Sequence, residues 1–235
     1  MRREGAADGV LYKEVIYDEG RWEILRQKRG VAKRVMEPFV VRGFGPVVYG
    51  SVARGDVHEA SDVEVFIPVP PNPALIEAIV ESELGGWVRR ELVQATPAYV
   101  PKAYIYLDEK TTISFPLLKL MPEEESFYKT AGMVGYEGLI NGDRAPGMNK
   151  SLVVIVPTRA GHAEFPADRD PDLAARLIGV DPITIRNRVR VLMRRRIHGR
   201  TGVFRAISLA EGESFTSAFA ELASQNPFLR RRLTG

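Results

Sequence analysis

Apolar residues recur at helical spacing in one part of the chain and alternate at strand spacing in others. Residues 20–38 carry Trp, Leu, Val and Met side chains at near-helical intervals, which predicts a helix that ends at Pro38. The short apolar runs 40–41 and 47–49 predict strands joined by a turn of glycine and proline. The run 63–69 alternates and then becomes continuously apolar, which predicts a further strand.

More elements follow in the middle of the chain. Residues 74–94 have a helical pattern that a pair of glycines interrupts. Two β-rich runs, 103–107 and 111–118, predict a hairpin because only three turn-forming residues separate them. The apolar run 151–156 predicts a strand, and the polar, turn-rich residues 157–170 predict a linker.

The last third of the chain predicts a helix-turn-helix followed by a β-wing. Pro171 opens one helix, and Gly179 supplies the turn. Asp181 is a favourable N-cap for a second helix over residues 182–196, and residues 199–209 contain two glycines before a β-rich run. The second helix would bury one apolar stripe, formed by Ile185, Val189 and Leu192.

These elements predict an α+β fold in two domains. Residues 1–157 would form a mixed sheet with flanking helices, and residues 158–235 would form a small helical domain that resembles a winged helix-turn-helix. No apolar run approaches the roughly 18 to 20 residues that cross a bilayer, and the N-terminus lacks an apolar signal segment. We therefore expect a cytoplasmic protein without a membrane partner.

Charge is distributed unevenly along the chain. Residues 151–235 hold 14 Lys+Arg, all of them arginine, against 8 Asp+Glu, whereas residues 1–150 hold 19 against 22. Such an excess favours a polyanionic partner, and it is equally compatible with a solvated arginine-rich surface. The chain has no cysteine and three scattered histidines, so carboxylates would have to hold any metal ion, which favours Mg²⁺ or Mn²⁺.

A glycine–serine turn and a pair of acids carry the clearest chemical signal. Gly50-Ser51 lies where the predicted strand 47–49 passes into a helix, and such a turn presents backbone N–H groups and a hydroxyl to a phosphate. Asp62 and Glu64 lie two positions apart at the start of a predicted strand, so their side chains share one face. Two acids beside a phosphate-binding turn form the first half of a metal site for nucleotidyl transfer.

The order of these residues resembles a known family. Gly50-Ser51 followed by Asp62-Val63-Glu64 resembles the signature of the DNA-polymerase-beta-like nucleotidyltransferases. Ala53-Arg54-Gly55 and Ser61-Asp62 resemble the small bacterial and archaeal members of that family and the archaeal CCA-adding enzymes. The resemblance covers residues 20–120.

The resemblance implies a nucleotidyltransferase-type mixed sheet and an NTP as substrate. Gly50-Ser51 would bind the triphosphate, and Asp62 and Glu64 would be the catalytic residues that hold Mg²⁺ or Mn²⁺. Arg54 would join the nucleotide-binding site by approaching a phosphate, or it would pair with an acid in the segment 56–59.

The family pattern is incomplete in this chain. Active members have a third carboxylate on a neighbouring strand, and here the best-matching run is 112–116, with Ser114 at the expected acid position. A serine hydroxyl is neither a base near neutral pH nor a ligand comparable to a carboxylate. Asp108 and Glu109 are turn residues of the predicted hairpin. The chain therefore manages with two acids, uses another residue, or binds nucleotide without turnover.

The basic C-terminal region allows two interpretations. One face of the second predicted helix carries Arg186, Arg190 and Arg194, and Arg200 lies in the predicted wing. Winged helix-turn-helix domains place such arginines on DNA or RNA, whereas other domains of this kind serve packing or dimerisation. The stretch 127–204 also resembles an archaeal family of nucleotidyltransferases with unassigned substrate.

Two hypotheses follow for the function. The first is a Mg²⁺-dependent enzyme that moves a nucleoside monophosphate from an NTP to an unidentified acceptor. The second is a nucleotide-binding regulator that has lost turnover and contacts DNA through its C-terminal region. The intact pair of Asp62 and Glu64 favours the first, and Ser114 favours the second.

Overall fold

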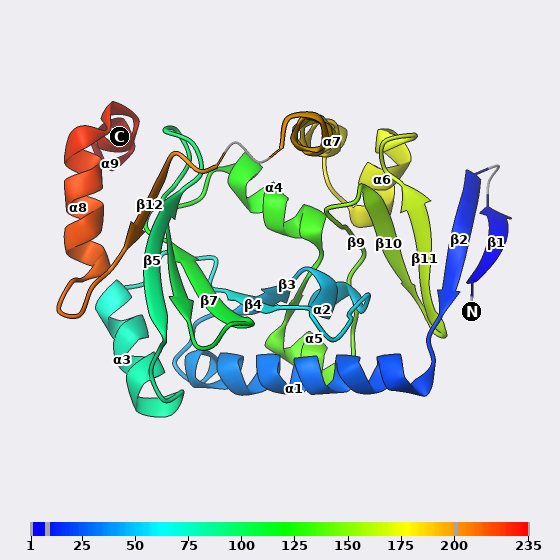
Figure 1. Cartoon of the computed structure of the whole chain (residues 1–235), viewed down its shortest axis with the longest axis horizontal. Helices are drawn as coiled ribbons and strands as arrows, with labels where there is room; N and C mark the ends of the chain where they lie inside the picture. The colour runs from blue at the N-terminus through cyan, green and yellow to red at the C-terminus, as the bar shows by residue number, and fades with distance from the viewer. Residues whose placement is uncertain (1, 8–9, 200–201, 235) are drawn as a thin grey trace.

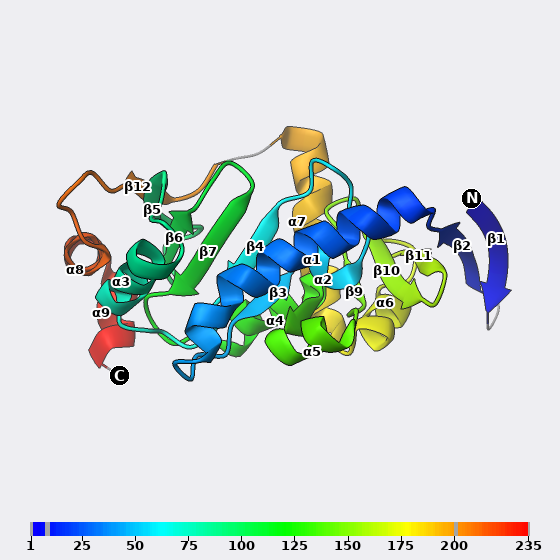
Figure 2. The ribbon, with the colours of Figure 1, turned by 90° about the horizontal axis from the view of Figure 1, so that it is seen from below.

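The computed structural model describes residues 2–7, 10–199 and 202–234, and it is an α+β protein built on two sheets. The long helix α1 (Glu19–Val40) runs along one side of the molecule, past both sheets (Figures 1 and 2). Its N-cap is Asp18, whose carboxylate accepts a hydrogen bond from the Arg21 backbone N–H. The predicted α+β class with a mixed sheet is confirmed.

The larger sheet is mixed. In spatial order its seven strands are β12 (Arg205–Ser208), β5 (Arg89–Gln94), β6 (Lys102–Tyr106), β7 (Thr111–Pro116), β4 (Val63–Phe66), β3 (Val47–Tyr49) and β8 (Met133–Gly135). Strands β4 and β7 pair in parallel, and the other neighbours pair antiparallel. The predicted hairpin is confirmed as β6 and β7.

The smaller sheet is antiparallel. Its order is β1 (Arg2–Ala7), β2 (Val10–Ile16), β11 (Gly161–Pro166), β10 (Val153–Thr158) and β9 (Gly147–Met148). Helices α6 (Pro171–Ile178) and α7 (Pro182–His198) pack on it. The apolar stripe predicted for the second helix is confirmed, since Ile185, Val189 and Leu192 are buried there.

The remaining helices cover the larger sheet. They are α2 (Ser51–Arg54), α3 (Pro73–Glu83), α4 (Pro122–Ala131), α5 (Tyr136–Asn141), α8 (Phe215–Gln225) and α9 (Pro227–Thr234). Helices α1, α3 and α8 share the main apolar core with one face of the sheet. Helix α4 covers part of the other face, where Phe66 stacks on Tyr128 with ring centroids 3.7 Å apart.

Two elements predicted within residues 20–94 are wrong. Residues 40–41 do not begin a strand, because α1 continues through Pro38 and places Phe39 in the core with no exposed surface. The segment after Gly85-Gly86 is strand β5 rather than helix. Its buried positions alternate, but two of them are Arg90 and Gln94, and these polar side chains hide the strand period.

The predicted linker 157–170 is also wrong. Most of this segment forms β11 and the end of β10, so the expected domain boundary at residue 157 falls inside a hairpin. Gly161 lies so close to strand β2 that a Cβ on it would be 1.9 Å from the Val15 carbonyl oxygen. The polar composition of the segment hid the strand, because His162 is buried and hydrogen-bonded to Tyr17 instead of solvated.

The predicted wing forms a strand in a different place. Strand β12 pairs with β5 at the edge of the larger sheet, and Phe215 of the following helix is fully buried in the main core. The β5 edge offers backbone N–H and C=O groups for strand pairing, which the helices α6 and α7 do not. Arg200, predicted for the wing, lies outside the described residues. Within the described chain, no helix combines the length and apolarity needed to span a membrane.

Candidate functional site

The turn between β3 and α2 has a backbone conformation that favours glycine at its first position. Gly50 has φ +78°, a region that other residues rarely adopt, and its N–H donates to the Gly132 carbonyl. A Cβ at this position would lie 3.4 Å from Oε2 of Glu64. The Ser51 hydroxyl has no hydrogen-bond partner among the described residues. The turn therefore places a backbone without a side chain next to the Glu64 carboxylate, and the following residue carries an unbonded hydroxyl.

Helix α1 holds this turn from behind. The guanidinium of Arg29, which is buried, donates to the carbonyl oxygens of Val52 and Ala53 at 3.2 and 3.1 Å. Burial lowers the pKa of Arg29 to about 10. Because Arg29 satisfies these carbonyl groups, α2 is fixed against the longest helix of the structure.

Strand β4 places the two acids on one face. Val63 and Val65 are buried in the main core, so Glu64 and the preceding Asp62 project to the opposite side. Asp62 is exposed and Glu64 is half-buried. Burial raises the pKa of Glu64, and the negative charge of Asp62 adds to that rise. A bound cation would relieve the repulsion between the Asp62 and Glu64 carboxylates.

Two groups near Glu64 were not predicted from the sequence. The Tyr49 hydroxyl donates to Oε1 of Glu64 at 3.1 Å, and the ammonium of Lys150 lowers the Glu64 pKa through its charge. Lys150 is exposed and lies in the loop between β9 and β10. No sequence motif predicts a role for Lys150, because this residue lies near the two acids only when the smaller sheet packs beside α2.

Ser114 lies on the strand next to the acid pair, as predicted, but it is not level with Glu64. Ser114 lies on β7, next to β4, but the register pairs it with Phe66, while Thr112 pairs with Glu64. The Ser114 side chain is buried, and its hydroxyl donates to the Val65 carbonyl at 3.4 Å. The position level with Glu64 is therefore occupied by a threonine.

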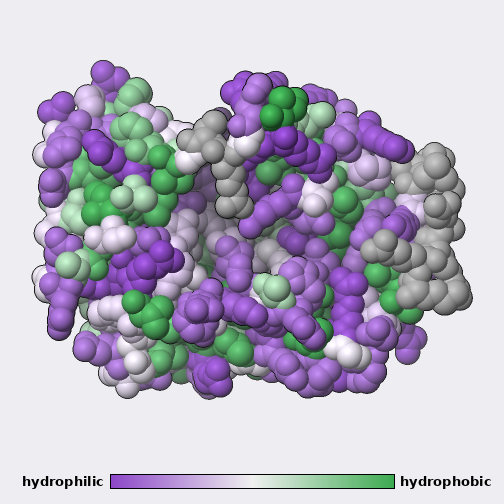
Figure 3. Space-filling model, in the orientation of Figure 1, coloured by the Kyte–Doolittle hydropathy of each residue, from purple (hydrophilic) through white to green (hydrophobic). Residues whose placement is uncertain are grey.

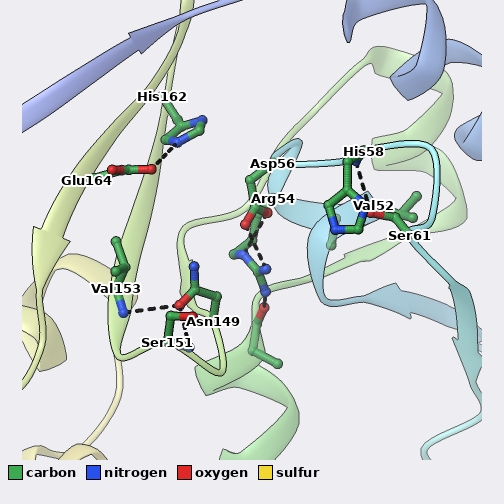
Figure 4. A network of polar contacts seen from close by, with 12 residues as sticks. Val52, Arg54, Asp56, His58, Ser61, Asn149, Ser151, Val153, His162 and Glu164 are labelled. Carbon is green, nitrogen blue, oxygen red and sulfur yellow. Dashed lines mark hydrogen bonds and ion pairs between the residues drawn. The ribbon is translucent and has the colours of Figure 1, made fainter. Parts of the chain in front are cut away.

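Arg54 pairs with an acid, as one of the two sequence interpretations stated. Its Nε and Nη2 each lie 3.0 Å from a carboxylate oxygen of Asp56, and its Nη1 donates to the Ala131 carbonyl (Figure 4). The side chains of Arg54 and Asp56 are 6% and 11% exposed. A guanidinium occupied in this way braces α2 against the end of α4 and is not free to bind phosphate.

His162 belongs to a buried hydrogen-bond chain. Its Nδ1 lies 2.6 Å from the Tyr17 hydroxyl. Its Nε2 lies 3.2 Å from the Glu164 carboxylate, a contact drawn in Figure 4. Burial lowers the pKa of His162 and raises that of Tyr17 to about 12. These hydrogen bonds connect β11 to the segment that leads into α1. They give His162 a structural role.

The arginines of α7 lie on its outer side. Arg186 forms an exposed ion pair with Asp172 at 2.7 Å, and Arg190 lies 3.4 Å from the Asn187 side-chain oxygen. The Arg194 side chain is exposed, with no hydrogen bond or ion pair in the part of the chain that the structure describes. This face is therefore not buried against the larger sheet.

The donor set of the site suits one kind of metal ion. Within the described ranges, no cluster of three or more His, Cys, Asp or Glu side chains is arranged to hold a metal. Mg²⁺ nevertheless keeps several waters and is usually held by one or two carboxylates together with substrate phosphates. Asp62 and Glu64, beside the open Gly50 turn, fit that requirement.

Comparisons with protein-family models, curated proteins and solved structures find no match for this chain. The class of the protein is therefore defined by the fold and the site. It is an α+β protein whose mixed sheet carries two carboxylates next to a glycine turn, with a basic helix packed on a second sheet.

Proposed function

We propose that the protein is a Mg²⁺-dependent nucleotidyltransferase, which moves a nucleoside monophosphate from an NTP to an acceptor. The observation that carries this proposal is the contact between the Gly50 turn and Glu64, whose Oε2 lies 3.4 Å from where a Cβ of residue 50 would be. Any larger residue would narrow the space between the turn and the acid. That space is where a triphosphate and its metal ion would meet.

The residues divide the task between them. Asp62 and Glu64 would hold the ion, which when bound neutralises charge on the triphosphate. The Ser51 hydroxyl and the Lys150 ammonium would bind phosphate oxygens. In the balanced reaction the acceptor oxygen bonds to the α-phosphorus, the bond from that phosphorus to the bridging oxygen breaks, pyrophosphate leaves, and the hydroxyl proton is released.

A label-transfer assay tests this proposal. The full chain is incubated with Mg²⁺, each NTP labelled at the α-phosphate, and fractionated cell extract as the acceptor source. Transfer of label to an acceptor, with release of pyrophosphate, supports the enzyme. Mg²⁺-dependent NTP binding without transfer favours the second candidate described below, and absence of such binding contradicts both.

We expect Thr112→Asp to strengthen Mg²⁺ binding by placing a third carboxylate level with Glu64. The strand register makes this the matching position on β7. The expected gain is about tenfold or more in affinity, measured by titration with Mn²⁺ or Mg²⁺, because a charged ligand replaces a neutral one. Ser114→Asp is the matched control. It should not strengthen binding and should destabilise the fold, since Ser114 is buried beside Phe66.

The second candidate is a nucleotide-binding regulator that contacts DNA or RNA. The absence of an acid at Thr112 and Ser114 favours it, as does the exposed arginine face of α7. Because β12 and α8 belong to the larger sheet, the isolated residues 158–235 are unsuited to a binding test and the full chain is required.

We expect Arg190→Ala to flatten the salt dependence of nucleic-acid binding, if this face contacts phosphates. The slope of log K against log salt should fall by about one, because each neutralised phosphate releases condensed counterions. Fluorescence anisotropy with duplex DNA and with RNA at several salt concentrations measures the slope. Arg26→Ala removes the same charge from α1 and should leave it unchanged. Equal slopes for Arg190→Ala and the wild type would exclude a contact of Arg190 with phosphate.

A further inference from the structure

Four tyrosine side chains lie around the Glu64 carboxylate. They come from three elements that are far apart in the sequence, since Tyr49 ends β3, Tyr104 and Tyr106 lie on β6, and Tyr128 lies on α4. Burial raises the pKa of all four hydroxyl groups, and the charge of Glu64 adds to each rise. All four hydroxyls therefore keep their protons near neutral pH and can donate hydrogen bonds.

One face of the larger sheet brings two of these side chains together. The strand register pairs Tyr104 with Ser114 and Ser114 with Phe66, whose ring stacks on Tyr128 with centroids 3.7 Å apart. Tyr104 acts on the pKa of Tyr128 more strongly than Glu64 does, which indicates that the two hydroxyls are neighbours. Figure 3 shows the surface recessed between the part formed by β5, β12 and α8 and the part formed by α4 and α7.

The other two tyrosine hydroxyls are already bonded within the protein. The Tyr49 hydroxyl donates to Oε1 of Glu64 at 3.1 Å. The Tyr106 hydroxyl donates to Oε2 of Glu91 at 3.0 Å. Each of these two hydroxyls thus has a carboxylate partner that accounts for its position.

The hydroxyls of Tyr104 and Tyr128 have no such partner. Neither forms a hydrogen bond with any residue that the structure describes. Tyr128 is only 2% exposed, yet its hydroxyl is not among the unbonded side-chain atoms that are sealed from solvent. The small surface that Tyr128 keeps therefore includes the hydroxyl. Because a buried tyrosine normally finds a partner for its O–H, this unbonded one indicates a binding site.

Under the proposed function, this pair of hydroxyls lies on the acceptor side of the acids. The triphosphate would bind at the Gly50 turn, which follows β3 on one side of β4. The attacking and leaving oxygens are in line during the transfer, so the acceptor approaches from the side opposite the departing pyrophosphate. On that side of Glu64 the next strands are β7 and then β6, which carries Tyr104.

The chemistry of the two unbonded hydroxyls favours a sugar. A tyrosine hydroxyl both donates and accepts a hydrogen bond, as a sugar hydroxyl does, so the pair can hold neighbouring hydroxyls of one molecule. The nearby Glu64 carboxylate would repel a phosphate or a carboxylate at this place. The rings of Tyr104 and Tyr106, which are nearly parallel with an interplanar angle of 22°, add an apolar surface.

We propose that the Tyr104 and Tyr128 hydroxyls bind the acceptor through its own hydroxyl groups, so that the acceptor is a sugar or a molecule that ends in one. This proposal rests on the proposed function for the position of the acceptor beside Asp62 and Glu64. The binding site itself stands on the two unbonded hydroxyls.

NMR spectroscopy of tyrosine rings tests the site, because the Cζ resonance responds to a hydrogen bond at the hydroxyl. The full chain, isotopically labelled at tyrosine Cζ, is titrated with free ribose and separately with a short single-stranded RNA that ends in ribose. We expect the resonances of Tyr104 and Tyr128 to shift with at least one probe. Tyr104→Phe and Tyr128→Phe assign these resonances by removing them.

The same variants measure what each hydroxyl contributes. Tyr104→Phe and Tyr128→Phe should each weaken binding of the probe about three- to tenfold, the usual effect of losing one hydrogen bond between uncharged groups. Neither should lower the free energy of unfolding, because the lost hydroxyl has no partner in the protein. Tyr99→Phe is the matched control, since Tyr99 is 45% exposed in the loop between β5 and β6, and it should bind like the wild type.

Three results would overturn the site. They are the absence of a shift with either probe, affinity equal to the wild type in both Tyr104→Phe and Tyr128→Phe, and an equal loss of affinity in Tyr99→Phe. A loss of stability in both Phe variants would reveal partners inside the protein and would contradict the proposal as well.

The site and the proposed function fail in different experiments. Asp62→Ala should keep the binding of ribose or RNA, and Tyr128→Phe should keep Mg²⁺-dependent NTP binding. RNA that binds more tightly than ribose, and loses that affinity when its last sugar lacks both free hydroxyls, identifies a strand end as the acceptor. Ribose that binds as tightly as the RNA identifies a free sugar.

Discussion

Asp62→Ala is expected to abolish Mg²⁺-dependent NTP binding and to leave the fold intact. Asp62 is exposed and forms no hydrogen bond with the described residues, so its removal uncovers no buried group. The loss should exceed the 10–100-fold that removal of an outer-shell partner of a metal costs, because a direct ligand disappears. Calorimetric titration with NTP, with and without Mg²⁺, measures the effect.

A control and a pH series sharpen this test. Glu59→Ala removes another exposed carboxylate from the same loop and should bind Mg²⁺ and NTP like the wild type. Since burial raises the pKa of Glu64, Mg²⁺-dependent binding should weaken on acidification at a higher pH than an ordinary glutamate would cause. Undiminished Mg²⁺-dependent binding in Asp62→Ala would contradict the metal site.

Arg54→Leu is expected to lower the free energy of unfolding by about 3–5 kcal/mol, as is usual when one partner of a buried ion pair is removed. The change leaves the Asp56 carboxylate, whose side chain is 11% exposed, without its two bonds to the guanidinium. It also leaves the Ala131 carbonyl without its donor. Urea denaturation followed by circular dichroism measures the free energy.

Two further variants distinguish a structural role of Arg54 from a role in phosphate binding. Arg54→Leu combined with Asp56→Leu should recover part of the lost stability, because no buried charge then stays unpaired. Arg26→Leu breaks an exposed ion pair on α1 and should change stability little. If Arg54→Leu were as stable as the wild type and only lost NTP affinity, Arg54 would be a ligand of the nucleotide and not a brace.

The parts of the fold that were predictable are those in which local pattern and burial agree. Residues 62–65 alternate polar and apolar side chains, and residues 63–66 form a strand whose valines enter the core. Asp181 and Pro182 mark a helix start that the structure has at that position. Strand β5 was missed because the buried Arg90 pairs with Glu77 of α3. The pattern of apolar residues along the chain does not reveal such an ion pair.

The candidate site divides in the same way. Gly50-Ser51, Asp62 and Glu64 were recognisable because their chemistry depends on short spacings along the chain. Lys150 and Tyr49 were not, since each becomes a neighbour of Glu64 only when separate strands pack together. The same is true of Tyr104 and Tyr128, which belong to different elements and meet on one face of the sheet.

By itself the sequence determined the α+β class, most helix starts, the buried stripes and the acid pair, because these follow from interactions between residues a few positions apart. Only the tertiary structure decided that β12 joins the larger sheet, that Thr112 and not Ser114 is level with Glu64, and that Arg54 is bound to Asp56. Strand order and register depend on which edges and apolar faces meet. A shift of two residues leaves every local pattern unchanged, so no local signal could have placed them.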